Sequence, residues 1–176
     1  LHVDITNDYL VVSAPNAVVG SGFPKGKVYL YKRTASSWIY EQTIIASNGS
    51  AGFTFGSDIA LDNDYLAIGA LGFNTYGVVY IYTRQNNIWE QIYEVNNPIF
   101  ELSGGFGGSI DLCKFKLIAG SLGENKAFIF DITNGVKLDT TLKSLDTLNS
   151  ELFGNSVAIN GYQAIVGAPA FDIGEY

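Results

Sequence analysis

Two side chains that could act as a catalytic base or nucleophile occur only once each in the chain, His2 and Cys113. A general base must lie within hydrogen-bonding reach of the proton it removes, and a nucleophilic thiol needs a basic group beside it. His2 falls in an expected strand at the start of the chain, and Cys113 falls in a turn with no histidine near it. The 17 acidic residues include no recurring pair that would indicate glycoside hydrolysis. We therefore expect no catalytic residue, no cofactor and an inert free thiol at Cys113.

The acidic triplet Asp62-Asn63-Asp64 resembles half of a calcium-binding loop. A complete loop folds several oxygen ligands around the ion and needs a glycine for its sharp turn, and the segment 62–65 has neither the length nor the glycine. The equivalent positions elsewhere in the chain carry few carboxylates: Thr6-Asn7-Asp8, Cys113-Lys114-Phe115 and Asn160-Gly161-Tyr162. We expect plain hairpin turns and no metal site at these four places.

These turns are equivalent because the whole chain repeats with a period of about 50 residues. The dipeptide Phe-Gly occurs at 55–56, 106–107 and 153–154. A trio of small residues follows each copy at constant spacing and occurs once more near the start: Ser13-Ala14-Pro15, Gly69-Ala70-Leu71, Gly120-Ser121-Leu122 and Gly167-Ala168-Pro169. The first Phe-Gly would lie before residue 1, so we expect the first and last copies to be cut short.

Each repeat predicts four short strands. The first alternates large apolar residues with others, which is typical of a strand with one buried face. Its residues expected to be buried are Ile59, Leu61, Ile110, Leu112, Val157 and Ile159. The second strand is an apolar run, as at 66–68, that suits burial on both faces, and the third alternates aromatic residues, as at 79–82. The fourth strand is expected at 38–44, 88–95 and 136–142. Because no helical periodicity is present, this pattern favours an all-β propeller blade over a sandwich.

The sequence Phe153-Gly154-Asn155-Ser156-Val157-Ala158-Ile159, followed by Ile165-Val166-Gly167-Ala168-Pro169, carries a family pattern. With its equivalents along all 176 residues, it resembles the FG-GAP repeat of integrin α chains and of many bacterial and eukaryotic surface proteins. The third copy departs from it, with Gly-Ser-Leu in place of Gly-Ala-Pro. The resemblance implies a β-propeller of four-stranded antiparallel blades, about seven in a closed ring, of which this chain supplies about 3.5.

We place the repeats at 1–52, 53–103, 104–150 and 151–176, within one propeller region. Either residues beyond both ends complete the ring, or the chain is an open fragment with exposed edge strands. The Phe-Gly and small-residue markers are interpreted as architectural, because small residues let blades approach closely and each phenylalanine can pack between neighbouring sheets. The family often holds calcium in an Asp-rich loop between these markers, but no copy here has enough carboxylates.

The connections after the second and fourth strands are expected to share one face of the propeller, and they vary in length and chemistry. Functional residues concentrate on variable loops held by a rigid scaffold. The candidate ligand-binding residues on these connections are Phe23, Phe73, Asn74, Tyr76 and Phe100. In addition, Asn48-Gly49-Ser50 matches the pattern of an N-glycosylation acceptor in a loop.

The composition narrows the choice of partner. A net charge of -7 and a pI near 4.5 disfavour nucleic acid, and the apolar runs are too short for a membrane-spanning helix. Together with the resemblance, this indicates a non-catalytic binding or adhesion module, extracellular or at the cell surface, that holds a protein ligand. The alternatives are a carbohydrate-binding propeller and a scaffold attached to an enzyme that lies outside these residues.

Overall fold

The structure is a computed structural model that describes residues 1–20, 24–47, 53–72, 76–99, 105–145 and 152–170. Over these residues the chain forms strands and one short 3-10 helix, η1 (Leu122–Glu124), with no α-helix. No helix in this part of the chain is long and apolar enough to cross a membrane. The prediction of an all-β fold is confirmed.

Consecutive strands build four antiparallel sheets, numbered 1 to 4 along the chain. Sheet 1 contains β1 (Val3–Ile5), β2 (Tyr9–Ala14), β3 (Lys27–Arg33) and β4 (Trp38–Ile44). Sheet 2 contains β5 (Phe53–Asp62), β6 (Tyr65–Gly72), β7 (Val78–Gln85) and β8 (Ile88–Asn96). Sheet 3 contains β9 (Phe106–Cys113), β10 (Lys116–Ser121), β11 (Lys126–Asp131) and β12 (Lys137–Lys143). Sheet 4 contains β13 (Ser156–Asn160) and β14 (Gln163–Gly167).

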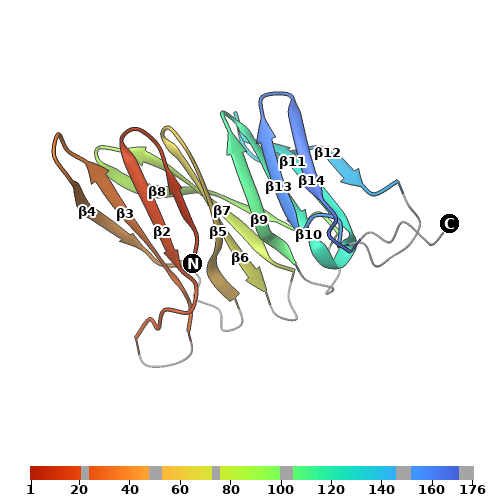
Figure 1. Cartoon of the computed structure of the whole chain (residues 1–176), viewed down its shortest axis with the longest axis horizontal. Helices are drawn as coiled ribbons and strands as arrows, with labels where there is room; N and C mark the ends of the chain where they lie inside the picture. The colour runs from red at the N-terminus through yellow and green to blue at the C-terminus, as the bar shows by residue number, and fades with distance from the viewer. Residues whose placement is uncertain (21–23, 48–52, 73–75, 100–104, 146–151, 171–176) are drawn as a thin grey trace.

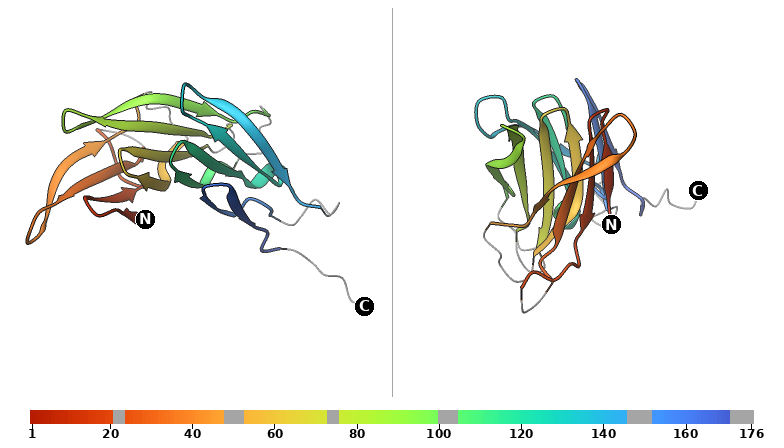
Figure 2. Two further views of the ribbon diagram at one scale, coloured as in Figure 1. Left: turned by 90° about the horizontal axis from the view of Figure 1, so that it is seen from above. Right: turned by 90° about the vertical axis from the view of Figure 1, so that its left-hand side faces the viewer.

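The sheets stand side by side, each packed against the next (Figure 1). Seen from above, they follow one another along an arc, with β8 and β12 on its convex side and β1 and β13 on its concave side (Figure 2). Within each four-stranded sheet, the strand order from one edge to the other is the order in sequence. This is the arrangement of blades in a partial, unclosed propeller.

The apolar core lies between neighbouring sheets, in three clusters. Five of the six residues expected to be buried in the first strands are buried: Ile59, Leu61, Ile110, Leu112 and Ile159. Val157 is only half-buried, because it faces sheet 3 from a sheet of two strands, which covers less area. The middle strands β6 and β10 are buried on both faces, as their continuous apolar sequences predict.

The same pattern has a different outcome at the two ends of the array. Val3 and Ile5 of β1 are 59% and 57% exposed, and Ile165 of β14 is 74% exposed. These residues lie on the outer faces of sheets 1 and 4. Among the described residues, no further sheet covers those faces. The local pattern therefore predicts the strand, while burial depends on whether another sheet covers that face.

The glycines of the repeat markers sit where two sheets meet. A Cβ atom added to Gly69 would lie 2.1 Å from the carbonyl oxygen of Gly107 on the next sheet, and one added to Gly120 would lie 2.1 Å from that of Gly154. Real carbon and oxygen atoms do not approach so closely. The Phe-Gly of each sheet thus packs directly on the small-residue trio of the sheet before it, which explains why the two markers recur together.

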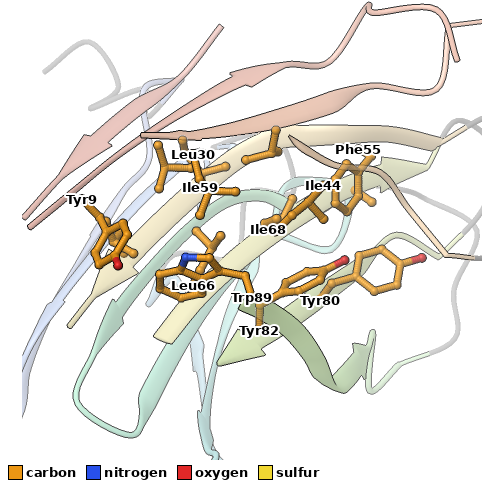
Figure 3. Packing of buried hydrophobic residues seen from close by; sticks show 14 of the residues in the cluster. Tyr9, Leu30, Ile44, Phe55, Ile59, Leu66, Ile68, Tyr80, Tyr82 and Trp89 are labelled. Atoms are coloured by element: carbon orange, nitrogen blue, oxygen red, sulfur yellow. The ribbon is translucent and has the colours of Figure 1, made fainter. Parts of the chain in front are cut away.

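The phenylalanines of the Phe-Gly markers pack between neighbouring sheets, beside these glycine contacts. Phe55 is fully buried between sheets 1 and 2 with its ring 5.6 Å from that of Tyr80 (Figure 3). Phe106 is fully buried between sheets 2 and 3, with its ring 6.1 Å from that of Phe128. The architectural interpretation of Phe-Gly is consistent with these contacts.

Aspartates connect the first strands of successive sheets. Asp4 accepts a hydrogen bond from the backbone N–H of Leu61 at 2.6 Å, and Asp58 accepts one from Ile110 at 2.8 Å. Asp111 repeats the arrangement with the N–H of Ile159 at 2.7 Å. Each first strand is the edge of its sheet, so these carboxylates satisfy N–H groups that have no partner strand.

Candidate functional site

The strand connections divide into two groups at opposite ends of the sheets, as expected from the sequence. Short turns join the first and second strands at 6–8, 63–64, 114–115 and 161–162. The second and fourth strands end, and the strands that follow them begin, at the other end of the sheets, the lower one in Figure 1. We call these the turn end and the loop end.

Tyr76 is the candidate ligand-binding residue that the structure describes. It lies on the connection between β6 and β7 at the loop end and is 39% exposed. The next residue, Gly77, has a φ of 68°, and a Cβ there would lie 2.2 Å from the carbonyl oxygen of Phe106. Tyr76 therefore stands beside the junction of sheets 2 and 3. The other candidates, Phe23, Phe73, Asn74 and Phe100, and the glycosylation candidate Asn48 lie outside the described residues and stay predictions.

A buried polar network anchors the loop end close to Tyr76. The side-chain amide of Asn97, which is fully buried, donates to Glu124 Oε1 at 2.7 Å. The hydroxyl of Ser121, also fully buried, donates to Glu124 Oε2 at 2.5 Å. The network ties the connection after β8 to helix η1 of sheet 3. Sequence reasoning missed it because Asn97 follows β8, whereas Ser121 ends β10 and Glu124 lies in η1 of the next repeat.

The turn end carries a feature that sequence reasoning did not anticipate. A groove of about 850 Å³ opens between sheets 1 and 2 and is lined mainly by polar atoms. Its charged and buried lining residues come from the two turns, from the start of β2 and from the ends of β3 and β7: Asp8, Tyr9, Lys32, Arg33, Asp64 and Arg84. The sequence showed the residues but not that two sheets bring them together.

Tyr9 forms the floor of this groove. Its side chain is only 4% exposed, the guanidinium carbon of Arg84 lies 4.9 Å from its ring centroid, and Trp89 packs edge-on at 5.5 Å. Figure 3 shows Tyr9 and Trp89 within the core between the sheets. Burial raises the pKa of the Tyr9 hydroxyl, and the negative charge of Glu41 acts in the same direction.

Four buried polar atoms around Tyr9 have no hydrogen-bond partner among the described residues: Tyr9 Oη, Glu41 Oε2, Arg84 Nε and Trp89 Nε1. A buried polar atom left unpaired costs about 1–3 kcal/mol of stability. Arg84 is otherwise engaged, because it donates to Asn87 and its Nη2 lies 4.0 Å from Glu41 Oε1. Tyr9 and Arg84 both line the groove and both carry an unpaired atom.

The next junction along the array is filled at the corresponding place. There the ring of Phe115, which occupies the turn position of Asp64, packs edge-on against Tyr65 at 5.4 Å. At the position where the groove between sheets 1 and 2 has Asp64, the following turn thus has an aromatic ring.

The residues first considered for chemistry have structural partners. The Nδ1 atom of His2 lies 3.0 Å from Asp58, whose pKa is raised by burial although the N–H groups of Ile110 and Ile59 lower it. The thiol of Cys113 accepts the backbone N–H of Gly161 at 3.3 Å and so joins sheets 3 and 4.

The acidic turn at 62–65 is a hairpin. The Asp62 carboxylate accepts the backbone N–H of Lys114 and, at 2.7 Å, the amide of Asn63. Within the described residues no group of three or more His, Cys, Asp or Glu side chains is placed to hold a metal ion.

One comparison with known proteins matches part of the chain. The model of the FG-GAP repeat matches residues 38–82, from β4 of sheet 1 into β7 of sheet 2. No curated protein was found to match the chain. The matched segment contains Phe55-Gly56 and Gly69-Ala70, the markers that pack between the sheets, and it confirms the resemblance there. Residues 38–82 match the FG-GAP repeat, and the described residues form an all-β array of propeller-like sheets that includes this segment.

Proposed function

We propose that this chain is a non-catalytic binding module that presents its loop end to a protein ligand in an extracellular or cell-surface setting. The FG-GAP repeat at 38–82 supports a propeller-like interaction module. The observation that carries the proposal is the contrast between junctions that are fixed by backbone contacts, as at Gly69 and Gly107, and connections that differ from sheet to sheet. Such a scaffold can hold variable recognition residues without changing its core.

The loop end has features suited to recognition. Tyr76 offers a partly exposed aromatic side chain, and the buried contacts of Asn97 and Glu124 hold the neighbouring connections in place. Aromatic residues supply much of the binding energy in protein interfaces, and a preordered surface loses less entropy on binding. Phe73, on the same connection as Tyr76, is expected to contribute to the same surface.

The proposal is tested by binding measurements on a panel of extracellular-matrix and cell-surface proteins, run beside a glycan array. Phe73→Ala and Tyr76→Ala together should weaken binding of a protein ligand by about 1 kcal/mol or more. The matched control changes Asn63 and Lys114 to alanine at the turn end. Equal losses from both ends would reject the loop end as the binding surface, and binding only to glycans would favour the carbohydrate alternative.

A further inference from the structure

Every junction of the described array joins the same two kinds of face. On the forward face of a sheet, which packs against the next sheet, the third residue of the second strand is fully buried: Val11, Ala67 and Ile118 in sheets 1 to 3. On the rear face, which packs against the preceding sheet, large apolar residues of the first strand are buried, as Ile59 and Leu61 are in sheet 2. A sheet therefore carries both halves of one repeated contact.

The array leaves one face of each kind uncovered at its two ends. Ile165, the third residue of β14, lies on the forward face of sheet 4 and is 74% exposed. Val3 and Ile5, which correspond to Ile59 and Leu61, lie on the rear face of sheet 1 and are more than half exposed. Among the described residues, no further sheet packs on either face. The forward face at one end of the array thus matches the rear face at the other end.

The two strands of sheet 4 are the strands on which a following sheet packs most. Within the array, β9 packs mainly against β5 and β6, the first and second strands of the sheet before it, and much less against β7. At the next junction, β13 packs in the same way on β9 and β10. Sheet 4 has the corresponding pair, β13 and β14. Its forward face is therefore complete for contact with a first strand such as β1.

A serine hydroxyl on the forward face can align such a contact. At the junction of sheets 3 and 4, the hydroxyl of Ser109 accepts the backbone N–H of Val157 at 3.1 Å. Ser156 has the place of Ser109 in sheet 4, one residue before the alternating apolar residues, and it is exposed. The group that corresponds to the Val157 N–H on the rear face of sheet 1 is the N–H of Val3. Both partners of this hydrogen bond are thus present at the ends of the array.

We propose that the rear face of sheet 1 docks on the forward face of sheet 4 of a second copy of this chain. Val3 and Ile5 then cover Ile165, and Ser156 accepts the N–H of Val3, in the arrangement that joins consecutive sheets within one copy. A second copy is the occupant because one chain carries both matching faces. Burial of apolar side chains drives the contact. Since two different faces meet, the association is head-to-tail, and it is independent of any ligand at the loop end.

Sedimentation equilibrium of the 176-residue chain tests the association, in about 0.15 M salt so that the net charge of -7 on each copy is screened. We expect the weight-average mass to rise above the monomer mass of 19.0 kDa between about 10 µM and 1 mM protein, as for a weak interface of small area. A mass that stays at the monomer value over this range would overturn the proposal in favour of a different polypeptide partner.

Two single variants each remove one face. Ile165→Asp alters the forward face of sheet 4 and Val3→Asp the rear face of sheet 1, and both should keep the parent's circular dichroism spectrum because both sites are exposed. Each variant alone should associate at least about tenfold more weakly, since the contact would bury an unpaired carboxylate. The matched control is Ile88→Asp on β8 of sheet 2, a residue that is 52% exposed and away from both faces. Unchanged association of either variant, or an equal loss in the control, would overturn the assignment.

A mixture of the two variants tests the head-to-tail geometry. The Ile165→Asp chain keeps an intact rear face and the Val3→Asp chain an intact forward face, so the mixture should form a heterodimer with an affinity close to that of the parent and grow no further. A contact between two identical faces would instead let one variant associate with itself as the parent does, with no gain on mixing. That result would overturn the proposal.

Discussion

The Oδ2 atom of Asp111 accepts a hydrogen bond from the backbone nitrogen of Ile159 at 2.7 Å, while Oδ1 of the same carboxylate accepts one from Leu112 at 2.8 Å. A single side chain thus satisfies one N–H of its own strand and one of the next sheet. Asp4 and Asp58 do the same at the two preceding junctions. The first strands of the sheets are therefore joined by side-chain carboxylates where backbone pairing is absent.

Replacement of Asp111 by alanine should destabilise the chain by about 1–3 kcal/mol, because two backbone N–H groups lose their acceptor in a partly buried place. Chemical denaturation followed by tryptophan fluorescence measures the loss. Asp139→Ala is a matched control, since Asp139 is an exposed partner of Lys116 on β12 and such pairs contribute about 0–1 kcal/mol. A loss at Asp111 no larger than that of the control would contradict the role given to the carboxylate.

Gly69→Ala should be among the most damaging small substitutions in the chain. The added Cβ would lie 2.1 Å from the Gly107 carbonyl oxygen, which belongs to the backbone of the next sheet and can yield only if the sheets separate. Overpacking of this kind costs about 1–3 kcal/mol or more. Gly108→Ala serves as control, because its nearest atom would be 3.2 Å away. Urea unfolding of both variants tests the difference, and equal stabilities would show that the junction can widen.

Removal of calcium should not change the melting temperature of the chain, because we expect no calcium site at the hairpin turn 62–65. The Asp62 carboxylate is already occupied by the N–H of Lys114 and the amide of Asn63, so it has little free capacity for a cation. The melting temperature with EDTA should equal that with added calcium. A clear fall in EDTA that calcium reverses would reveal a calcium site and refute this expectation.

The fold could be predicted from the sequence because every repeat carries the same markers and the same alternation. The strand expected at 38–44 is β4, and the fourth strands of the next two sheets differ from expectation by about one residue. Burial was less predictable, because Val3 and Ile5 have the pattern of Ile59 and Leu61 yet face outward. Alternation specifies a strand, but it does not specify which neighbour covers it.

The site was harder to predict because it depends on pairs of residues from different repeats. Compared one at a time, the four turns look alike, and the packing of Phe115 on Tyr65 distinguishes the junction of sheets 2 and 3 from that of sheets 1 and 2. The bridging aspartates were missed for a related reason. Asp4 and Asp111 occupy the same position in the repeat, whereas Asp58 lies two residues earlier, where Ala60 has the equivalent position. A comparison of aligned positions therefore does not reveal their common role.

Asp131 should give a local signature of acid titration. Its pKa is lowered from 3.8 to about 2, mainly because the backbone N–H and hydroxyl of Thr133 bind the charged carboxylate, with a further contribution from Lys116. Because the folded pKa is below the unfolded one, the stabilising contribution is complete above pH 3.8 and is lost as the pH falls toward 2.

Carbon-detected NMR titration of the Asp131 carboxyl group measures this pKa directly. Thr133→Val removes the hydroxyl but keeps the backbone N–H, so the pKa should rise part of the way toward 3.8. Lys116→Met should raise it by a smaller step, since the contact at 3.0 Å between Lys116 Nζ and Asp131 Oδ2 is a lesser cause than the contacts with Thr133. An unshifted Asp131 in the unmodified chain, or a larger effect of Lys116→Met than of Thr133→Val, would show that the turn after β11 does not hold the carboxylate as described.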